Sequence, residues 1–174
     1  MASYYYYLIS SLPMLKTQGE PPMDYGTFLD MCKAAVGSGV YKTLEELTVQ
    51  ASSGPLLSEW ASFYQALSRE LVYQRSVKLG RPCPVPSDRD AGITQAVTAA
   101  VNAENPLEGE RILLDLEFKR LDDMIGLHNF DEHALYGYAM KLRLLERQQG
   151  FRYEAGKRSF DGLIAHIQQQ VSSL

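Results

Sequence analysis

Apolar residues recur at intervals of three or four positions along most of this chain, and this spacing is typical of amphipathic helices. The clearest stripe contains Leu57, Trp60, Leu67 and Leu71, and glycine or proline separates one such segment from the next. The pattern predicts a mainly all-α protein, a bundle of about six to seven helices. The expected helices cover residues 24–36, 43–50, 57–80, 93–101, 106–125, 131–150 and 160–171.

Residues that favour helix starts precede several of these segments. Asp24 and Asp131 are expected N-caps, because an aspartate side chain can accept hydrogen bonds from the free N–H groups of the first turn. Thr43, with a glutamate three residues later, has the spacing of a capping box. Pro106 follows Asn105 and would occupy the first helical turn, where proline is favoured.

The segment 4–12 can be interpreted in two ways. It contains four consecutive tyrosines and Ile9, which suit a β-strand. Apolar runs of this length are equally common in short helices. The sequence therefore leaves open whether the chain begins with a short strand or a short helix, and Pro13 ends the segment in either case.

Three prolines divide the chain near its middle. Pro82, Pro84 and Pro86 stand within the segment 81–89, and neither a helix nor a central strand tolerates this density of proline. We expect this segment to be a hinge between two helical halves, residues 1–80 and 90–174. The length of 174 residues is that of one domain, so both halves are expected to belong to a single unit.

Composition excludes several classes of protein. Apolar residues make up 45% and charged residues 22% of the chain, which argues against intrinsic disorder. The net charge of -4 shows no basic excess, so we expect no nucleic-acid partner. No apolar run approaches the roughly 20 residues that cross a bilayer. Cys32 and Cys83 form no CxxC pair, and the first residues lack a basic signal-peptide region, so we expect a cytoplasmic protein.

One group of residues could bind a metal ion. His128, Asp131, Glu132 and His133 lie within six positions, although their spacing matches no standard zinc motif. Helix capping by Asp131 and a favourable first-turn position for Glu132 explain the two acidic residues without a metal. Glycine-rich phosphate loops and nucleophile motifs are lacking in the sequence. We therefore expect no catalytic centre, no metal site and no cofactor.

Charged residues gather on two of the expected helices. Carboxylates crowd the segment 106–125, and on a helix such spacings usually form a solvated face with ion pairs rather than a catalytic pair. Those acidic residues are Glu108, Glu110, Asp115, Glu117, Asp122 and Asp123. A basic group near the C-terminus could meet an acidic partner or form another solvated face. That group comprises Lys141, Arg143, Arg147, Arg152, Lys157 and Arg158.

Two stretches of the sequence resemble a known family. The first is YYYLISSLPML at residues 5–15 with GEPPM at 19–23, and the second is NPLEGER at 105–111 with YGYAMKLRLLER at 136–147. Both are similar to a family of uncharacterised bacterial proteins encoded beside the subunits of V-type ATPases. The resemblance covers nearly the whole chain, and the opening motif is its more specific part.

The segment 134–147 also resembles a helix of the C subunit of the V/A-type ATPases, which corresponds to the d subunit in eukaryotes. Proteins of that family are all-helical, longer than this chain, and form a socket between the central stalk and the membrane rotor ring. The resemblance implies a non-catalytic accessory or C-subunit-like component with a reduced set of helical units. Its partners would be the stalk and rotor-ring subunits, and it would lie in the cytoplasm, peripheral to the inner membrane through the complex.

Tyrosines and basic residues are the expected partner contacts. Tyrosine occurs 11 times in the chain, and its large rigid ring with a polar tip is enriched at interfaces, although tyrosine also fills cores. The expected contact residues are Tyr4, Tyr5, Tyr6, Tyr7, Tyr136, Tyr138, Lys141 and Arg143. Two other hypotheses remain: a general helical adaptor for an unrelated partner, and a metal-dependent enzyme around the two histidines near residue 130.

Overall fold

The computed structural model describes residues 5–54, 56–150 and 164, and all of its regular structure is helical. No strand occurs among these residues, which confirms the all-α prediction. The expected helix at 160–171 lies outside the described residues except for Ile164. The helices are α1 (Tyr6–Ser11), α2 (Tyr25–Lys33), α3 (Ser38–Glu45), α4 (Leu57–Lys78), α5 (Ala91–Val101), α6 (Pro106–Ile125) and α7 (Glu132–Gln149).

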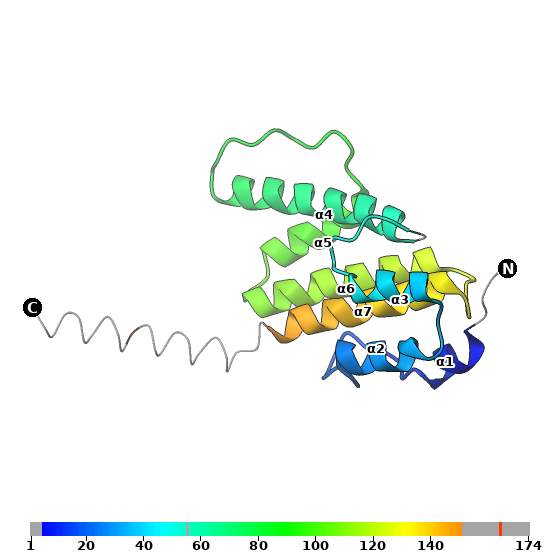
Figure 1. Cartoon of the computed structure of the whole chain (residues 1–174). Helices are drawn as coiled ribbons and strands as arrows, with labels where there is room; N and C mark the ends of the chain where they lie inside the picture. Colours follow the sequence, from blue (N-terminus) through cyan, green and yellow to red (C-terminus); the bar gives the residue numbers. More distant parts are fainter. Residues whose placement is uncertain (1–4, 55, 151–163, 165–174) are drawn as a thin grey trace, which may run out of the picture.

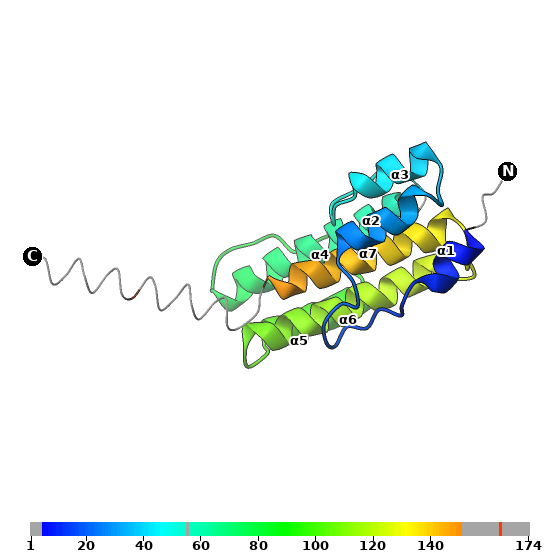
Figure 2. The ribbon, with the colours of Figure 1, turned by 60° about the horizontal axis from the view of Figure 1, so that its bottom comes forward.

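A hairpin of α6 and α7 forms the middle of the molecule, and the other helices stack on its two sides (Figure 1). On one side α5 packs against α6, and α4 packs against α5. On the other side α2 and α3 pack against α7, and α1 lies at the end where α6 turns into α7 (Figure 2). Helix α7 is therefore covered by α6 on one side and by N-terminal helices on the other.

The buried apolar residues form one core that includes both sides of the proline-rich segment. Phe28 of α2 and Trp60 of α4 are fully buried, as are Leu114 and Leu121 of α6 and Leu142 of α7. The Trp60 indole Nε1–H donates to the carbonyl of Val49 at 2.8 Å, so this large side chain is buried with its polar atom satisfied. The segments before and after residues 81–89 thus share their hydrophobic core.

The N-terminal segment is helical, so the alternative of a short strand is wrong for the described residues. Tyr5 and Leu8 are buried, and the Tyr5 N–H donates to the carbonyl of Phe130 at 2.8 Å. Contact with the loop before α7 therefore holds this segment in place, and its helical conformation does not follow from local propensity alone. The helix ends with Leu12 as its C-cap, and this extended residue directly precedes Pro13, as expected of a position before proline.

The expected N-caps are confirmed. Asp24 accepts from the Thr27 N–H at 2.8 Å, and Asp131 accepts from the Ala134 N–H at 3.1 Å. Asn105 caps α6 in the same way, with Pro106 in the first turn. Side-chain caps stabilise a helix start by about 1 kcal/mol each.

The expected helix at 43–50 is misplaced. Helix α3 begins at Ser38 and ends at Glu45, and its N-cap is Gly37 rather than Thr43. Thr43 instead lies inside the helix, where its hydroxyl donates to the carbonyl of Gly39 at 3.1 Å. Gly37 and Gly39 are typical of a break between helices, but both have space around them and neither has a positive φ angle, so a helix can start here.

The proline-rich segment 81–89 is a loop between α4 and α5, and its last residue is tied to α4 (Figure 1). The Arg89 Nε and Nη2 atoms donate to the two carboxylate oxygens of Glu70 at 3.0 and 2.6 Å. Gln74 donates to the same carboxylate at 2.9 Å. These hydrogen bonds hold the pKa of Glu70 below its usual range, and the bond from Arg89 has the largest effect. The loop is therefore anchored where we expected a hinge.

Helices α5 and α6 approach each other closely at one glycine. A Cβ atom at Gly109 would lie 2.6 Å from the carbonyl oxygen of Ala100, a backbone atom that cannot move without shifting α5. Gly109 is buried, so no larger side chain can be accommodated towards solvent. The contact between these two helices depends on this missing side chain.

Replacing Gly109 with alanine should therefore destabilise the protein by about 1–3 kcal/mol, the usual cost of overpacking a close contact. Gly39→Ala provides the matched control, because nothing lies within 4 Å of its Cβ position in α3. That variant should be stabilised by about 0.4–1 kcal/mol through the lower entropy of its unfolded chain. Urea unfolding measures both, and equal effects of the two substitutions would contradict the close approach.

Replacing Arg89 with methionine should lower the melting temperature at pH 7 and lower it less near pH 3. The folded pKa of Glu70 is lowered, so its contribution to stability exists above its usual pKa and is lost as the pH falls. Arg81→Met, at an exposed position of the same loop, is the control and should leave the melting temperature unchanged at both pH values. Thermal unfolding at the two pH values tests this, and a pH-independent loss would argue against the Glu70 anchor.

Candidate functional site

The structure separates the N-terminal tyrosines into one buried residue and two exposed ones. The side chain of Tyr5 is buried, whereas Tyr6 is 54% and Tyr7 is 89% exposed. The Tyr6 ring lies 5.6 Å from the Tyr7 ring and 4.7 Å from that of Phe130, measured between ring centroids. Tyr4 lies outside the described residues. We call the surface formed by Tyr6, Tyr7 and Phe130 the aromatic end.

The loop of the aromatic end also presents an aliphatic side chain. Leu127 is 96% exposed in the segment 126–131 that joins α6 to α7. A large apolar side chain held this far into water gains nothing for folding, although single exposed apolar residues are common. Together with the two exposed tyrosines, it gives this end of the molecule the composition of a contact surface.

Two tyrosines expected to contact a partner are instead part of the fold. Tyr136 is buried, because α7 is covered at this position, and burial raises the pKa of its hydroxyl. The Tyr138 hydroxyl donates to the carbonyl of Pro13 at 3.0 Å, and burial raises its pKa to about 12. Tyr5 and Tyr136 thus belong to the buried core and the partly buried Tyr138 packs against it, while their role as partner contacts stays a prediction.

The two basic residues expected as contacts also have partners within the chain. Lys141 forms an ion pair with Asp122 of α6 and lies 5.4 Å from the centroid of the Phe118 ring. Its side chain is only 14% exposed. The Arg143 Nε donates to the carbonyl of Leu47 at 3.0 Å, and its guanidinium stacks over the Tyr25 ring at 3.4 Å. Both cations thus have partners within the chain, and their role as partner contacts stays a prediction.

Arg143 belongs to a polar junction that joins α7 to α2 and α3. Glu146 accepts from the Arg143 Nη1 at 3.1 Å and from the backbone N–H of Tyr25 at 2.9 Å. The buried Tyr25 hydroxyl donates to the carbonyl of Leu44 at 2.7 Å, and desolvation raises its pKa. The junction satisfies a free N–H at the start of α2 and a carbonyl just after α3.

A buried ion pair joins α6 and α7, and its Glu117 is the exception to the expected solvated acidic face, because Glu108, Asp115, Asp122 and Asp123 are exposed. The Arg147 Nη1 and Nη2 atoms donate to the two carboxylate oxygens of Glu117 at 3.2 and 2.7 Å. The Glu117 side chain is 1% exposed. Desolvation raises the pKa of Glu117 although the Arg147 charge opposes this. The remaining basic residues of the C-terminal group, Arg152, Lys157 and Arg158, lie outside the described residues.

The sequence contained a signal for this buried carboxylate. Glu117 stands three or four positions from Leu113, Leu114 and Leu121, so it interrupts the apolar stripe of its own helix. Glu70 interrupts the stripe of α4 in the same way, three residues after Leu67. A charged residue on an apolar stripe indicates a buried partner of opposite charge.

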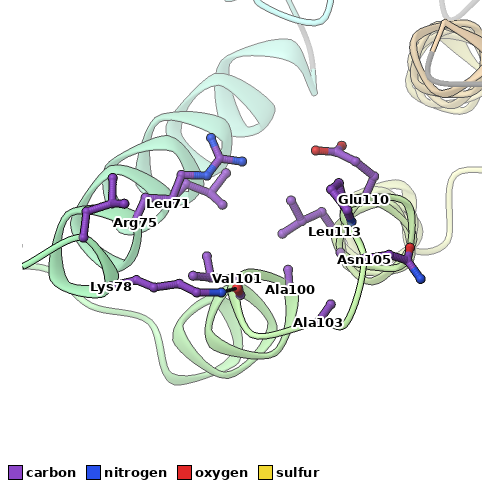
Figure 3. A pocket seen from close by; sticks show the side chains of 12 residues that line it. Leu71, Arg75, Lys78, Ala100, Val101, Ala103, Asn105, Glu110 and Leu113 are labelled. Carbon is purple, nitrogen blue, oxygen red and sulfur yellow. Dashed lines mark hydrogen bonds between the residues drawn. The ribbon is translucent and has the colours of Figure 1, made fainter. Parts of the chain in front are cut away.

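A groove of about 370 Å³ lies between α4, the end of α5 and the start of α6 (Figure 3). Arg75 of α4 and Glu110 of α6 point towards the hollow from opposite walls, above the apolar side chain of Leu113 (Figure 3). Lys78 donates to the carbonyl of Val101 at its edge. Among the described residues that line it, the groove has no serine, cysteine or histidine. Its chemistry suits binding of an amphipathic group.

Comparison of the chain with protein-family models, with curated proteins and with solved structures found no match. Among the described residues, no helix has both the length and the apolar character needed to cross a membrane.

Replacing Arg147 with methionine should cost about 3–5 kcal/mol, because it leaves the Glu117 carboxylate buried without its partner. The double variant Glu117→Leu/Arg147→Met removes both charges and should recover most of this loss. Urea unfolding of both variants measures the difference. Two equal losses would mean that the stranded carboxylate is not the cause.

The loss in the Arg147→Met variant should also depend on pH. Burial raises the pKa of the Glu117 carboxyl in the folded protein, so the fold tolerates this group best in its neutral form. The folded state therefore loses stability as the pH rises and the carboxyl ionises. The variant should therefore be less stable relative to the native chain at pH 8 than at pH 5. The double variant lacks the carboxyl, so its loss should be the same at both pH values.

Proposed function

We propose that this chain is a non-catalytic accessory or C-subunit-like component of a bacterial V-type ATPase or ATP synthase. It would act in coupling or scaffolding between the central stalk and the membrane rotor ring. The proposal rests on the opening motif at residues 5–15 and on the similarity of 134–147 to a helix of the C subunit. An all-helical body built of stacked helices is compatible with this role.

The arrangement of the opening motif is the observation that carries the proposal. Tyr5 and Leu8 attach α1 to the rest of the fold, while the adjacent Tyr6 and Tyr7 remain exposed. A short helix of 6 residues is not stable alone, so its place must be fixed by these buried contacts. The motif thus supports a fixed presentation of two tyrosines to a partner, and large aromatic rings often dominate binding energy at interfaces.

The partner surface would be the aromatic end, and the association would be through protein. The chain would then reside in the cytoplasm, peripheral to the inner membrane through the ATPase complex. The four expected contacts on α7 are used within the fold, so the proposal now assigns contact to Tyr6 and Tyr7 with Leu127 beside them.

A general helical adaptor is the second candidate function, and the groove beside α4 favours it. Its walls combine Leu71 and Leu113 with one free cation at the mouth, since the Arg75 guanidinium has no hydrogen bond or ion pair among the described residues. An amphipathic helix from an unrelated partner could lie against such a surface. The two functions use different surfaces, which allows one experiment to separate them.

Co-purification from the native cell tests the proposal. The tagged chain should recover the stalk and rotor-ring subunits of the V-type ATPase, and Tyr6→Ser/Tyr7→Ser should reduce their recovery at least tenfold. Val72→Ser, which is 60% exposed on α4, is the matched control and should recover them like the native chain.

Two other outcomes of the co-purification would contradict the ATPase proposal or favour the adaptor. Absence of ATPase subunits in the native sample would overturn the ATPase proposal. Recovery of other proteins that is lost in Leu71→Ser but kept in the tyrosine variant would support the adaptor instead. Circular dichroism of each variant before the experiment confirms that a lost partner does not reflect unfolding.

A further inference from the structure

Three metal-ligating side chains gather at the loop that precedes α7. One ligand atom from each of His128, Asp131 and His133 lies within 4.8 Å of the others. The two imidazole rings are stacked, with centroids 4.2 Å apart and an angle of 11° between their planes. The Nδ1 atom of His128 contacts the Asp131 Oδ2. His128 and His133, which lie on either side of the N-cap Asp131 in the sequence, are therefore neighbours in the structure.

The loop that carries these side chains is fixed by its backbone. The His128 N–H donates to the carbonyl of Ile125 at 2.9 Å, and the Phe130 carbonyl accepts from the Tyr5 N–H at 2.8 Å. Gly126 turns the chain after α6 with a φ of 52°, a conformation that favours glycine. The three ligating residues are thus positioned by hydrogen bonds of the protein itself.

Helix capping accounts for only part of this arrangement. The Asp131 Oδ1 accepts from the Ala134 N–H at 3.1 Å, which completes the cap. Its second oxygen is directed to His128, and His133 takes no part in the cap. The cap explains why an aspartate stands at this position, but it does not explain two imidazoles beside it.

We propose that His128, Asp131 and His133 bind one divalent transition-metal ion of the Zn²⁺ class. Imidazole nitrogen and carboxylate oxygen are common ligands of such ions, at about 2.0–2.2 Å from zinc. Ligands around a tetrahedral zinc would be about 3.3 Å apart. The three ligand atoms already lie within 4.8 Å of one another, and metal binding would require the stacked imidazole rings of these partly exposed side chains to tilt towards a common ion.

The chemistry of the site follows from its ligands. Asp131 supplies one negative charge, which offsets the unfavourable field of the α7 N-terminus on a cation. Three protein ligands leave a fourth position that water or a side chain from another protein can fill. Glu132, which the sequence had grouped with these residues, is not part of the cluster. The site is independent of the proposed ATPase role.

The test measures Zn²⁺ binding to the untagged full-length chain after treatment with a chelator. Isothermal titration should show one ion per chain, and Co²⁺ in place of Zn²⁺ should give visible d–d absorption bands. His128→Ala and His133→Ala should each weaken Zn²⁺ binding at least tenfold. Asp131→Asn keeps a good helix cap but removes the charge, so it should weaken binding without unfolding α7.

Two variants serve as matched controls. His166→Gln removes the one remaining histidine, and Cys83→Ser removes the more accessible thiol, so both should bind Zn²⁺ like the native chain. Zn²⁺ should raise the melting temperature of the native chain and of both controls but not that of His133→Ala. The melting temperature of each variant without metal shows whether its fold is intact. The further change on adding Zn²⁺ then shows whether the site is present.

The proposal would be overturned by any of three results. The native chain could fail to bind one equivalent of Zn²⁺. The His128→Ala and His133→Ala variants could bind as tightly as the native chain, which would place the ion elsewhere. Binding could also be lost in a control variant, which would assign the ion to His166 or Cys83.

Discussion

Helix α7 has neighbours on both sides, and the rest of the structure depends on how its charged residues find partners there. Leu142 and Leu145 are buried, so the helix cannot turn its cations to solvent without exposing its apolar face. Arg147 is paired with Glu117 on the α6 side, and Arg143 satisfies a carbonyl on the α3 side. A charge left unpaired at such a depth costs several kcal/mol. These bonds therefore specify how α6, α2 and α3 are placed around α7.

This constraint also determines which surface is left for a partner. Tyr136, Tyr138, Lys141 and Arg143 of α7 have contacts within the chain, whereas Tyr6 and Tyr7 of α1 are exposed and a groove lies beside α4. The aromatic end and the histidine cluster share the loop before α7, because the Phe130 carbonyl seats α1 while His128 lies two residues earlier. One rigid loop thus supports the proposed contact surface and the proposed metal site.

Sequence patterns predicted most helices because their signals are local. Asp24, Asn105 and Asp131 cap their helices through bonds to the third residue after them, which the chain spacing alone allows. The start of α3 was missed because two glycines resemble a stop whenever their surroundings are unknown. The candidate site was harder to predict. The four adjacent tyrosines cannot be distinguished by their local sequence. In the structure Tyr5 is buried and its N–H is bonded to the Phe130 carbonyl, whereas Tyr6 and Tyr7 are exposed.

The sequence by itself determined the helical class, the main helix starts and the break at residues 81–89, since periodicity and capping act within one or two turns. Only the tertiary structure decided that α1 is a helix, that Glu117 and Glu70 are buried with arginine partners, and that three potential metal ligands meet before α7. Burial and charge pairing join residues that are distant in the chain. Glu117 and Arg147, 30 positions apart, become neighbours only when α6 folds back on α7.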